Sequence, residues 1–305
     1  MRITILALLL SSSLLSGCAS TSSQEPESNS RPHVVNNVII SEPLVVDYVS
    51  ESNVAKLTHL INYVKLEKDK LAELLYERGV IYDRMGLRTL SQLDFQRALS
   101  LRKDYADAYN FIGIHLTLLG QYNEAFEAFD SALELEPEHS YAYLNRGIAL
   151  YYYGRPELAI DDLEQFHVKK ASDPYRAIWL YLAEHKIDPE GAKLRLIYNS
   201  HAIDKNLWAF QLVELFLGRI DEQTFINGMA KNVSSTRQLV DRLCEGYFYL
   251  AKLKLQQGEE EAAKNYFRLA LTTNVYEFVE HKYARLELDR LYRIAKKRFE
   301  QANPS

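Results

Sequence analysis

The fold is decided by the stretch ADAYNFIGIHLTLLGQYNEAFEAFDSALELEPEH, residues 106–139. In its first half, Ile112 and Leu116 are four positions apart, which places them on one face of a helix. We expect Gly120 to end this helix, because a residue without a Cβ adopts the left-handed capping conformation freely. We expect a second helix to follow and to end at Pro137, because proline cannot continue a helix. The stretch therefore predicts a helix–turn–helix unit.

This unit recurs along the chain with a fixed period. Gly79, Gly113 and Gly147 are 34 positions apart, and each is followed seven residues later by a second glycine. A period of 34 residues is typical of the tetratricopeptide repeat, a helix pair that buries its apolar face only by stacking on its neighbours. The sequence therefore predicts an all-α fold, a tetratricopeptide-repeat helical solenoid.

The repeat pattern divides the chain into successive segments. We predict three tetratricopeptide repeats over 72–173, degenerate helical pairs over 174–243, and a C-terminal repeat over 244–277. A terminal helix and tail are expected over 278–305. Residues 51–71 are predicted to form an N-terminal helix with an apolar stripe, which either dimerises or folds back as an intramolecular cap. We find no sustained alternation of apolar and polar residues, so no sheet is expected.

The N-terminus has the pattern of a bacterial lipoprotein signal. A charged start and a short apolar stretch lead to LSGC at residues 15–18, which resembles the lipobox. We predict a signal peptide over 1–17 and a covalent lipid on Cys18, and no other cofactor. The alternative is a chance cysteine in an ordinary signal peptide. Because Ala19 differs from the aspartate that resembles an inner-membrane retention signal, the predicted location is the outer membrane, facing the periplasm.

Residues 18–50 are expected to be an acylated and disordered tether. They are rich in serine, glutamate, proline and asparagine, a composition that cannot bury enough apolar surface to fold. A flexible tether of about 30 residues has an r.m.s. span of about 30 Å, which would let the repeats stand clear of the lipid. With Cys18 lipidated, only Cys244 remains, so no intramolecular disulfide is possible. The role of Cys244 stays open.

Charge and motifs argue against several classes of function. The 36 basic and 41 acidic residues give a net charge of −5, and we find no basic stripe. This argues against nucleic acid and against electrostatic binding to anionic lipid, and leaves the lipid anchor as the membrane contact. HExxH, GxGxxG, GxxxxGK and GxSxG motifs are all absent. We expect His115 to be a surface or interhelical residue, and we predict no catalytic residue, no metal site and no enzymatic activity.

The concave surface of the solenoid is the candidate binding site. The first helix of each repeat lines this surface, and tyrosine is a residue type favoured at binding surfaces. Five of the 21 tyrosines lie within residues 141–153, although packing between helices is an alternative role for them. A carboxylate clamp is not expected, because Tyr76 and Val80 stand where it requires lysine and asparagine. A groove for apolar or extended polypeptide fits better. The candidate partner-binding residues are Tyr76, Asn110, Tyr141, Leu144, Tyr151, Tyr152, Phe248 and Leu255.

Longer strings resemble one family. LLYERGVIYDRMGLR at 74–88, YAYLNRGIALYYYGR at 141–155 and FVEHKYARLEL at 278–288 are similar to the NlpI family of outer-membrane lipoproteins. The resemblance implies a homodimeric adaptor that has no catalytic activity. It would bring a periplasmic tail-specific protease (Prc-like) together with murein endopeptidases (MepS-like), which the protease degrades. The family would thereby regulate the turnover of cell-wall hydrolases and scaffold wall-synthesis complexes.

Two other classes of function stay open at this point. Tetratricopeptide lipoproteins also occur in machines that assemble outer-membrane proteins or pili, and co-purified subunits would identify such a role. An enzyme of cell-wall turnover is the other alternative. Cleavage of murein by the purified protein alone would establish it.

Overall fold

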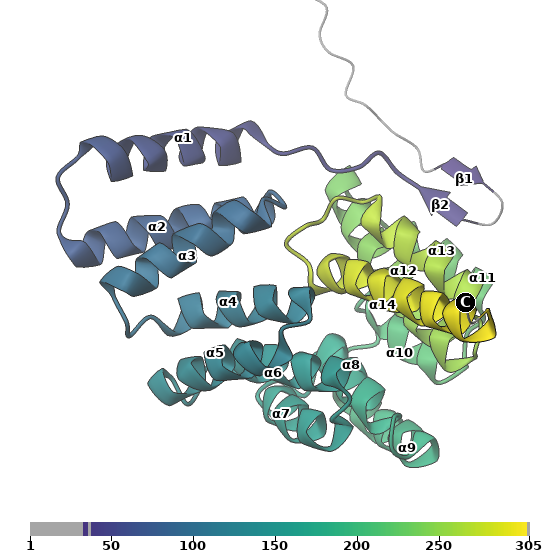
Figure 1. Cartoon of the computed structure of the whole chain (residues 1–305). Coiled ribbons are helices and arrows are strands. Elements are labelled where there is room, and N and C mark those ends of the chain that lie inside the picture. Colours follow the sequence, from purple (N-terminus) through teal and green to yellow (C-terminus); the bar gives the residue numbers. More distant parts are fainter. Residues whose placement is uncertain (1–32, 36–37, 304–305) are drawn as a thin grey trace, which may run out of the picture. The chain divides into compact units, whose positions relative to one another are not determined.

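The computed structural model describes residues 33–35 and 38–303, with side chains from residue 38 onward. Within these residues the chain forms fourteen α-helices, one 3-10 turn and one short hairpin of strands (Figure 1). The predicted all-α solenoid of helix pairs is confirmed. The signal peptide and Cys18 lie outside the described residues. None of the helices within 38–303 combines the length and the apolarity needed to cross a bilayer.

The strands are β1 (His33–Val35) and β2 (Val38–Ile40). The helices of the first part are α1 (Tyr48–Tyr63), α2 (Lys68–Arg84), α3 (Arg88–Leu101), α4 (Ala106–Leu119), α5 (Tyr122–Leu135), α6 (Ser140–Tyr153) and α7 (Pro156–Val168). The remaining elements are α8 (Pro174–Glu184), α9 (Pro189–Asn199), η1 (Ser200–Ala202), α10 (Phe210–Phe216), α11 (Glu222–Met229), α12 (Thr236–Gln256), α13 (Glu260–Leu271) and α14 (Val279–Ala302).

Three regular hairpins, α2–α3, α4–α5 and α6–α7, form the first part of the solenoid. Their turns contain Gly86, Gly120 and Gly154 with φ of +76°, +76° and +90°, a conformation that side chains with a Cβ rarely adopt. Inside the α4–α5 hairpin, a Cβ on Gly113 would lie 2.5 Å from Cε1 of Phe129. The paired helices therefore touch at Gly113, as the repeat pattern predicts.

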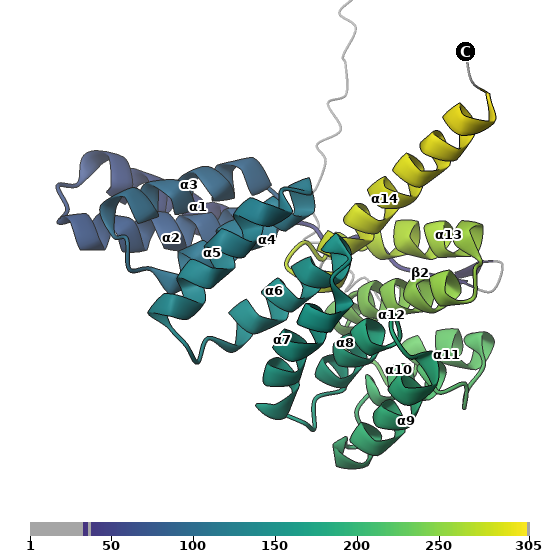
Figure 2. The same ribbon diagram turned by 60° about the horizontal axis from the view of Figure 1, so that its bottom comes forward.

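The main apolar core lies in the second part of the chain. It extends from β2 and α6 through to α14, and α8 is buried on almost every side. A helix that is apolar all round is expected in such a core. The predicted degenerate region therefore folds as short helices, α8 to α11. α10 and α11 pack on the long helix α12, and α9 packs on α8 (Figure 2).

The predicted tether is too long at its C-terminal end. β1 and β2 pair in antiparallel fashion, with Val35 opposite Val38, and Ile39 is only 2% exposed. The hydroxyl of Tyr247 in α12 donates to the carbonyl of Ile39 at 2.6 Å and accepts from its N–H at 2.7 Å. Residues 38–50 are therefore ordered, and a short hairpin is present where no sheet was expected. One buried isoleucine and one tyrosine hydroxyl fix a segment whose composition indicates disorder.

The predicted helix over 51–71 is in fact two helices. α1 begins earlier, where Asp47 caps its N-terminus by accepting from the N–H of Ser50 at 2.8 Å, and it ends at Tyr63. α2 starts after a short break, at Lys68. α1 packs on α2 with Leu57 buried, which is the contact expected of an intramolecular cap. The alternative, a dimer contact, stays a prediction.

Candidate partner-binding groove

A cavity of about 520 Å³ lies along the first helices of the three N-terminal repeats. One wall is formed by side chains of α2, α4 and α6, which are the helices predicted to line the concave surface. The opposite wall is formed by residues 277–283, the turn before α14 and the first turn of that helix. We call this cavity the repeat groove. It is bounded both by the repeats and by the C-terminal helix.

Three of the predicted contact residues line the repeat groove. Asn110 is buried at its base, where its Oδ1 accepts a hydrogen bond from Nδ2 of Asn145 at 3.0 Å. Leu144 lies beside this pair and is largely buried. Tyr141 is 60% exposed, with its ring 6.0 Å from that of Phe166. The groove therefore offers one accessible aromatic side chain above a polar and apolar base.

A buried carboxylate joins the two walls of the repeat groove. Asp83 of α2 accepts from Nε2 of His115 at 2.9 Å and pairs with Nζ of Lys282 in α14 at 3.0 Å. Burial alone would raise the pKa of Asp83, but the hydrogen bond from His115 and the charge of Lys282 together lower it. Asp83 is therefore held as a carboxylate. His115 is an interhelical residue, one of the two positions expected for it.

A second cavity, of about 500 Å³, continues from the repeat groove between α1 and α2. Val80 and Arg84 line both cavities, so the two are adjacent. Tyr76 lies in this second cavity, and its ring packs 4.6 Å from that of Tyr105 and 5.6 Å from that of Phe95. Leu57 and Leu60 of α1 line the same cavity. Tyr76 is thus near the repeat groove but separate from Tyr141.

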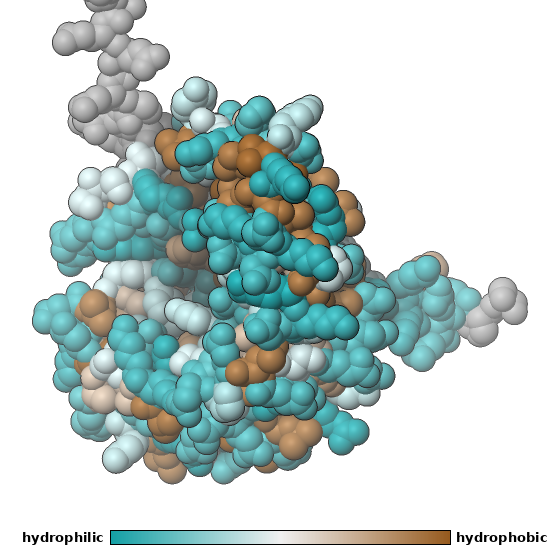
Figure 3. Space-filling view, turned by 90° about the vertical axis from the view of Figure 1, so that its left-hand side faces the viewer, coloured by the Kyte–Doolittle hydropathy of each residue, from teal (hydrophilic) through white to brown (hydrophobic). Residues whose placement is uncertain are grey.

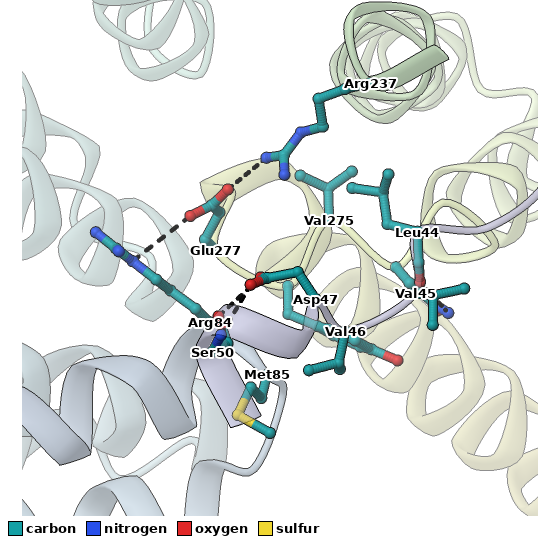
Figure 4. A pocket seen from close by; sticks show the side chains of 12 residues that line it. Leu44, Val45, Val46, Asp47, Ser50, Arg84, Met85, Arg237, Val275 and Glu277 are labelled. Carbon is teal, nitrogen blue, oxygen red and sulfur yellow. Dashed lines mark hydrogen bonds and ion pairs between the residues drawn. The ribbon is translucent and has the colours of Figure 1, made fainter. Parts of the chain in front are cut away.

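A third cavity, of about 210 Å³, lies where the N-terminal segment crosses between the first and last repeats (Figure 4). Glu277 lies between two guanidinium groups, pairing with Arg84 of α2 at 3.6 Å and with Arg237 of α12. Residues 44–47 lie beside this bridge and lead into α1. Arg84 and Glu277 also line the repeat groove, so the bridge borders it.

Three of the predicted contact residues are buried in the core, which corrects their assignment. Tyr151 is 8% exposed, Tyr152 4% and Phe248 0%. Nζ of Lys252 donates to the hydroxyl of Tyr151 at 3.0 Å, and the ring of Tyr152 stacks on that of Tyr283, with centroids 5.1 Å apart. These tyrosines lie at concave positions of the third repeat, but α12 and α14 fold back over them.

The eighth predicted residue, Leu255, lies on α12 and packs partly buried against the same core. The residues that the sequence analysis missed are those of the second wall of the repeat groove: Phe278, Val279, Lys282 and Tyr283. Their apolar members follow a helical spacing at the start of the last helix, which indicates a buried face but not what it packs against. Among residues 38–303, no group of three metal-ligating side chains comes together.

Comparisons with known proteins agree with this architecture. The tetratricopeptide repeat family matches residues 72–105, 106–139 and 245–274. The α6–α7 hairpin, which is the third predicted repeat, lies outside these segments but forms the same helix pair.

Several solved structures are similar to the chain. The Rap conjugation gene regulator of the plasmid pLS20, solved in complex with the Phr* peptide, is 15% identical with a TM-score of 0.53. That match covers 82% of this chain and 72% of the regulator. A tetratricopeptide repeat protein from Parabacteroides merdae is 16% identical with a TM-score of 0.48, over 80% of this chain and 91% of that protein. PilF of Pseudomonas aeruginosa is 18% identical with a TM-score of 0.43, over 72% and 99%.

The matched segments coincide with the hairpins α2–α3, α4–α5 and α12–α13. In each of these hairpins the two helices pack directly on each other. The family matches and the observed helix pairs together show that the chain contains tetratricopeptide repeats within an all-α solenoid of helix pairs.

Proposed function

We propose that this protein is a non-enzymatic adaptor that holds polypeptide partners in the repeat groove. The observation that carries the proposal is the cavity of about 520 Å³ along α2, α4 and α6, with Tyr141 exposed in it. Helix-lined grooves bind polypeptide through a few aromatic or apolar anchors surrounded by polar groups. The pLS20 regulator with its bound peptide gives a precedent for peptide recognition by a similar fold.

The resemblance to the NlpI family supports a more specific proposal. The adaptor is lipid-anchored through Cys18 in the outer membrane, faces the periplasm and acts as a homodimer. It brings a Prc-like tail-specific protease together with MepS-like murein endopeptidases and so controls the amount of cell-wall hydrolase. Light scattering of the intact soluble protein at micromolar concentration tests the dimer. Membrane fractionation of the Cys18→Ser variant tests the anchor, since the variant should leave the membrane fraction or stay an uncleaved precursor.

The groove is tested by a matched pair of exposed tyrosines. Tyr141→Arg places a long charged side chain in the groove, whereas Tyr198→Arg makes the same change on α9, outside the groove, at a residue that is 77% exposed. Loss of an aromatic anchor at an interface corresponds to about 2 kcal/mol, roughly 30-fold in affinity. We expect only Tyr141→Arg to weaken the capture of endopeptidase and slow its degradation by added protease.

The identities of the captured partners decide between the open alternatives. Envelopes are solubilised, and chains that bind the starting protein but not Tyr141→Arg are identified. A protease and wall hydrolases support the adaptor proposal. Barrel-assembly or pilus subunits in their place support the assembly-machine alternative. Murein cleavage by the purified protein alone would contradict the absence of enzymatic activity.

A further inference from the structure

The last turns of α14 carry the densest positive charge on the described chain. Residues 290–298 read RLYRIAKKR, with five cationic side chains and no acidic one. Since the whole chain has a net charge of −5, the remainder carries −10. We call residues 290–302 the basic arm. The basic arm corrects the expectation that the chain has no basic stripe; the acidic net charge of the whole chain conceals it.

The basic arm is accessible and only partly neutralised. From Tyr292 to its end, every residue of α14 is exposed except Ala295, which is partly buried. Arg298 pairs with Glu260 of α13 at 3.0 Å, and Lys296 is 3.8 Å from Glu300 on the same helix. Within the described residues, Arg293 and Lys297 have no carboxylate at ion-pair distance. The end of α14 extends away from the repeats (Figures 2 and 3).

The arm also has an apolar face. Tyr292, Ala295 and Phe299 are spaced by three, four and seven positions, and they continue the buried face of Leu288 and Leu291 beyond the core. Phe299 is 69% exposed and Tyr292 49%. Arg293 and Lys297 lie on the other side of the helix, and Lys296 lies at the edge of the apolar face. Exposed aromatic side chains on one face and lysine and arginine on the other are typical of helices that lie in the surface of a bilayer.

The arm and the N-terminal end of the described chain lie on the same repeat. β2 contacts α11, and Ile39 lines a small cavity together with Val240 and Leu243 of α12 and Leu269 of α13. α14 packs on α13. The chain between Cys18 and Val38 spans at most about 70 Å when fully extended. A membrane that held Cys18 would therefore be within reach of the repeat that carries the arm, which favours lipid over an acidic protein as the occupant.

We propose that the basic arm docks on a bilayer that contains anionic phospholipids, with Phe299 and Tyr292 entering the headgroup region. A cluster of four to eight lysine and arginine residues on an amphipathic helix is sufficient for such recognition. The contact is separate from the lipid on Cys18 and adds to it, since one anchor and a polybasic patch together hold a protein more firmly than either alone. It orients the repeats relative to the membrane.

The test uses residues 18–305 with Cys18→Ser, so that neither the predicted signal peptide nor a covalent lipid contributes and the arm is tested apart from the anchor. The protein is sedimented with vesicles of phosphatidylethanolamine and phosphatidylglycerol, three to one, and with phosphatidylcholine vesicles. We expect binding to the anionic vesicles only, and loss of binding as salt rises from about 0.05 M to about 0.5 M, because the Debye length shortens.

Two triple variants with equal charge change separate the arm from net charge. Arg293→Glu, Lys296→Glu and Lys297→Glu together should weaken binding to the anionic vesicles about tenfold or more. The control is Lys193→Glu, Lys205→Glu and Lys231→Glu, three exposed lysines of the middle helices and loops, which should leave binding within about twofold. Circular dichroism verifies that both variants keep their helices.

Three outcomes would overturn the proposal. The first is no binding of the starting protein to anionic vesicles at low salt, and the second is an equal loss of binding in both triple variants. The third is an arm variant that keeps vesicle binding but loses an acidic protein partner. Phe299→Ser gives a further measure: a severalfold loss of vesicle binding at unchanged salt dependence supports insertion of the ring.

Discussion

The first two repeats and the C-terminal repeat consist of the same helix pair, yet they are stabilised differently. In the first two repeats the buried clusters are small and mostly join neighbouring helices, as do Ala72, Leu75 and Ala98 of α2 and α3. Helix α12 of the C-terminal repeat instead lies within one core that reaches from α6 to α14. Repeats of a solenoid normally contact only their neighbours. The same helix pair therefore occurs in two settings. In the first two repeats it forms an open stack, in which small clusters join neighbouring helices, and in the C-terminal repeat it belongs to a closed core that distant helices share.

Two buried charge pairs follow the same division, whereas Asp83 of α2, which pairs with Lys282 of α14, joins the two parts. In the first repeat, Arg78 of α2 makes two hydrogen bonds to Asp94 of α3 at 2.7 and 2.8 Å, so this pair stays within one hairpin. In the C-terminal half, Lys252 of α12 pairs with Glu287 of α14 at 2.5 Å and also donates to Tyr151 of α6. One buried cation therefore links three helices that are far apart in sequence.

Breaking these two pairs should give the largest effects and the clearest contrast. Lys252→Met removes the closest cation from buried Glu287, which keeps only the more distant Arg290 at 3.8 Å, and we expect a loss of about 3 kcal/mol in the free energy of unfolding, measured with urea. Hydrogen exchange should accelerate in α6, α12 and α14 together. Arg78→Met also breaks a buried pair, but its faster exchange should be confined to α1, α2 and α3. If both variants accelerated hydrogen exchange over the same helices, the division into an open stack and a closed core would be contradicted.

The two parts should also respond to pH in opposite directions. Glu245 of α12 accepts from Nε1 of Trp208 at 2.9 Å, and Glu280 of α14 accepts from the hydroxyl of Tyr249 at 2.8 Å. Burial, and the charge of Glu280, raise the pKa of Glu245; burial also raises that of Glu280. Asp83 of α2, in the first repeat, instead has a cationic partner, Lys282 of α14, and its pKa is lowered.

A group with a raised pKa stabilises the fold when protonated, so its contribution is complete below the ordinary glutamate pKa of 4.5 and is lost as pH rises above it. The free energy of unfolding of the starting protein should fall by about 2–3 kcal/mol between pH 5 and pH 8, because Glu245 ionises over this range. We expect Glu245→Gln to abolish this fall. Asp83 contributes above its ordinary pKa of 3.8 and loses its contribution as pH falls. Asp83→Asn should therefore flatten only the acid side of the profile, which thermal unfolding across pH measures.

Within the open stack, Gly113→Ala tests the closest approach of two helices. The added Cβ would meet Phe129 at 2.5 Å, and overpacking of this kind reduces stability by about 2 kcal/mol. Gly120→Ala is the control, since nothing lies within 4 Å of its Cβ and only the left-handed backbone, at φ +76°, opposes the change by about 1 kcal/mol. An unchanged melting temperature for Gly113→Ala would contradict this packing of α4 on α5.

The local part of this structure could be predicted from the sequence, and the non-local part could not. The period of 34 residues places Gly113, Gly120 and Asn110 correctly, because each depends on its own hairpin or the next one. Phe248 is predicted as a contact residue but is fully buried. The period predicts the face of the helix on which Phe248 lies, but it does not predict which other helix covers that face. The Tyr151 hydroxyl is likewise covered by Lys252, which is 101 positions away. Such contacts leave no periodic signal in either segment.

The smallest predicted effect concerns the segment that joins the two parts. Tyr247→Phe removes both hydrogen bonds that hold Ile39, at 2.6 and 2.7 Å, and we expect a loss of about 1 kcal/mol. Exchange of the Ile39 amide should accelerate strongly, while the helices keep their protection, because Leu44 still donates from its N–H to the carbonyl of Thr273 at 3.0 Å. Tyr266→Phe is the control: its ring stacks on Tyr247, and its hydroxyl bonds Glu222 rather than the strand. If Tyr247→Phe lowered protection throughout α12 and α13, residues 38–40 would belong to the closed core itself and would not be an independent connection between the two parts.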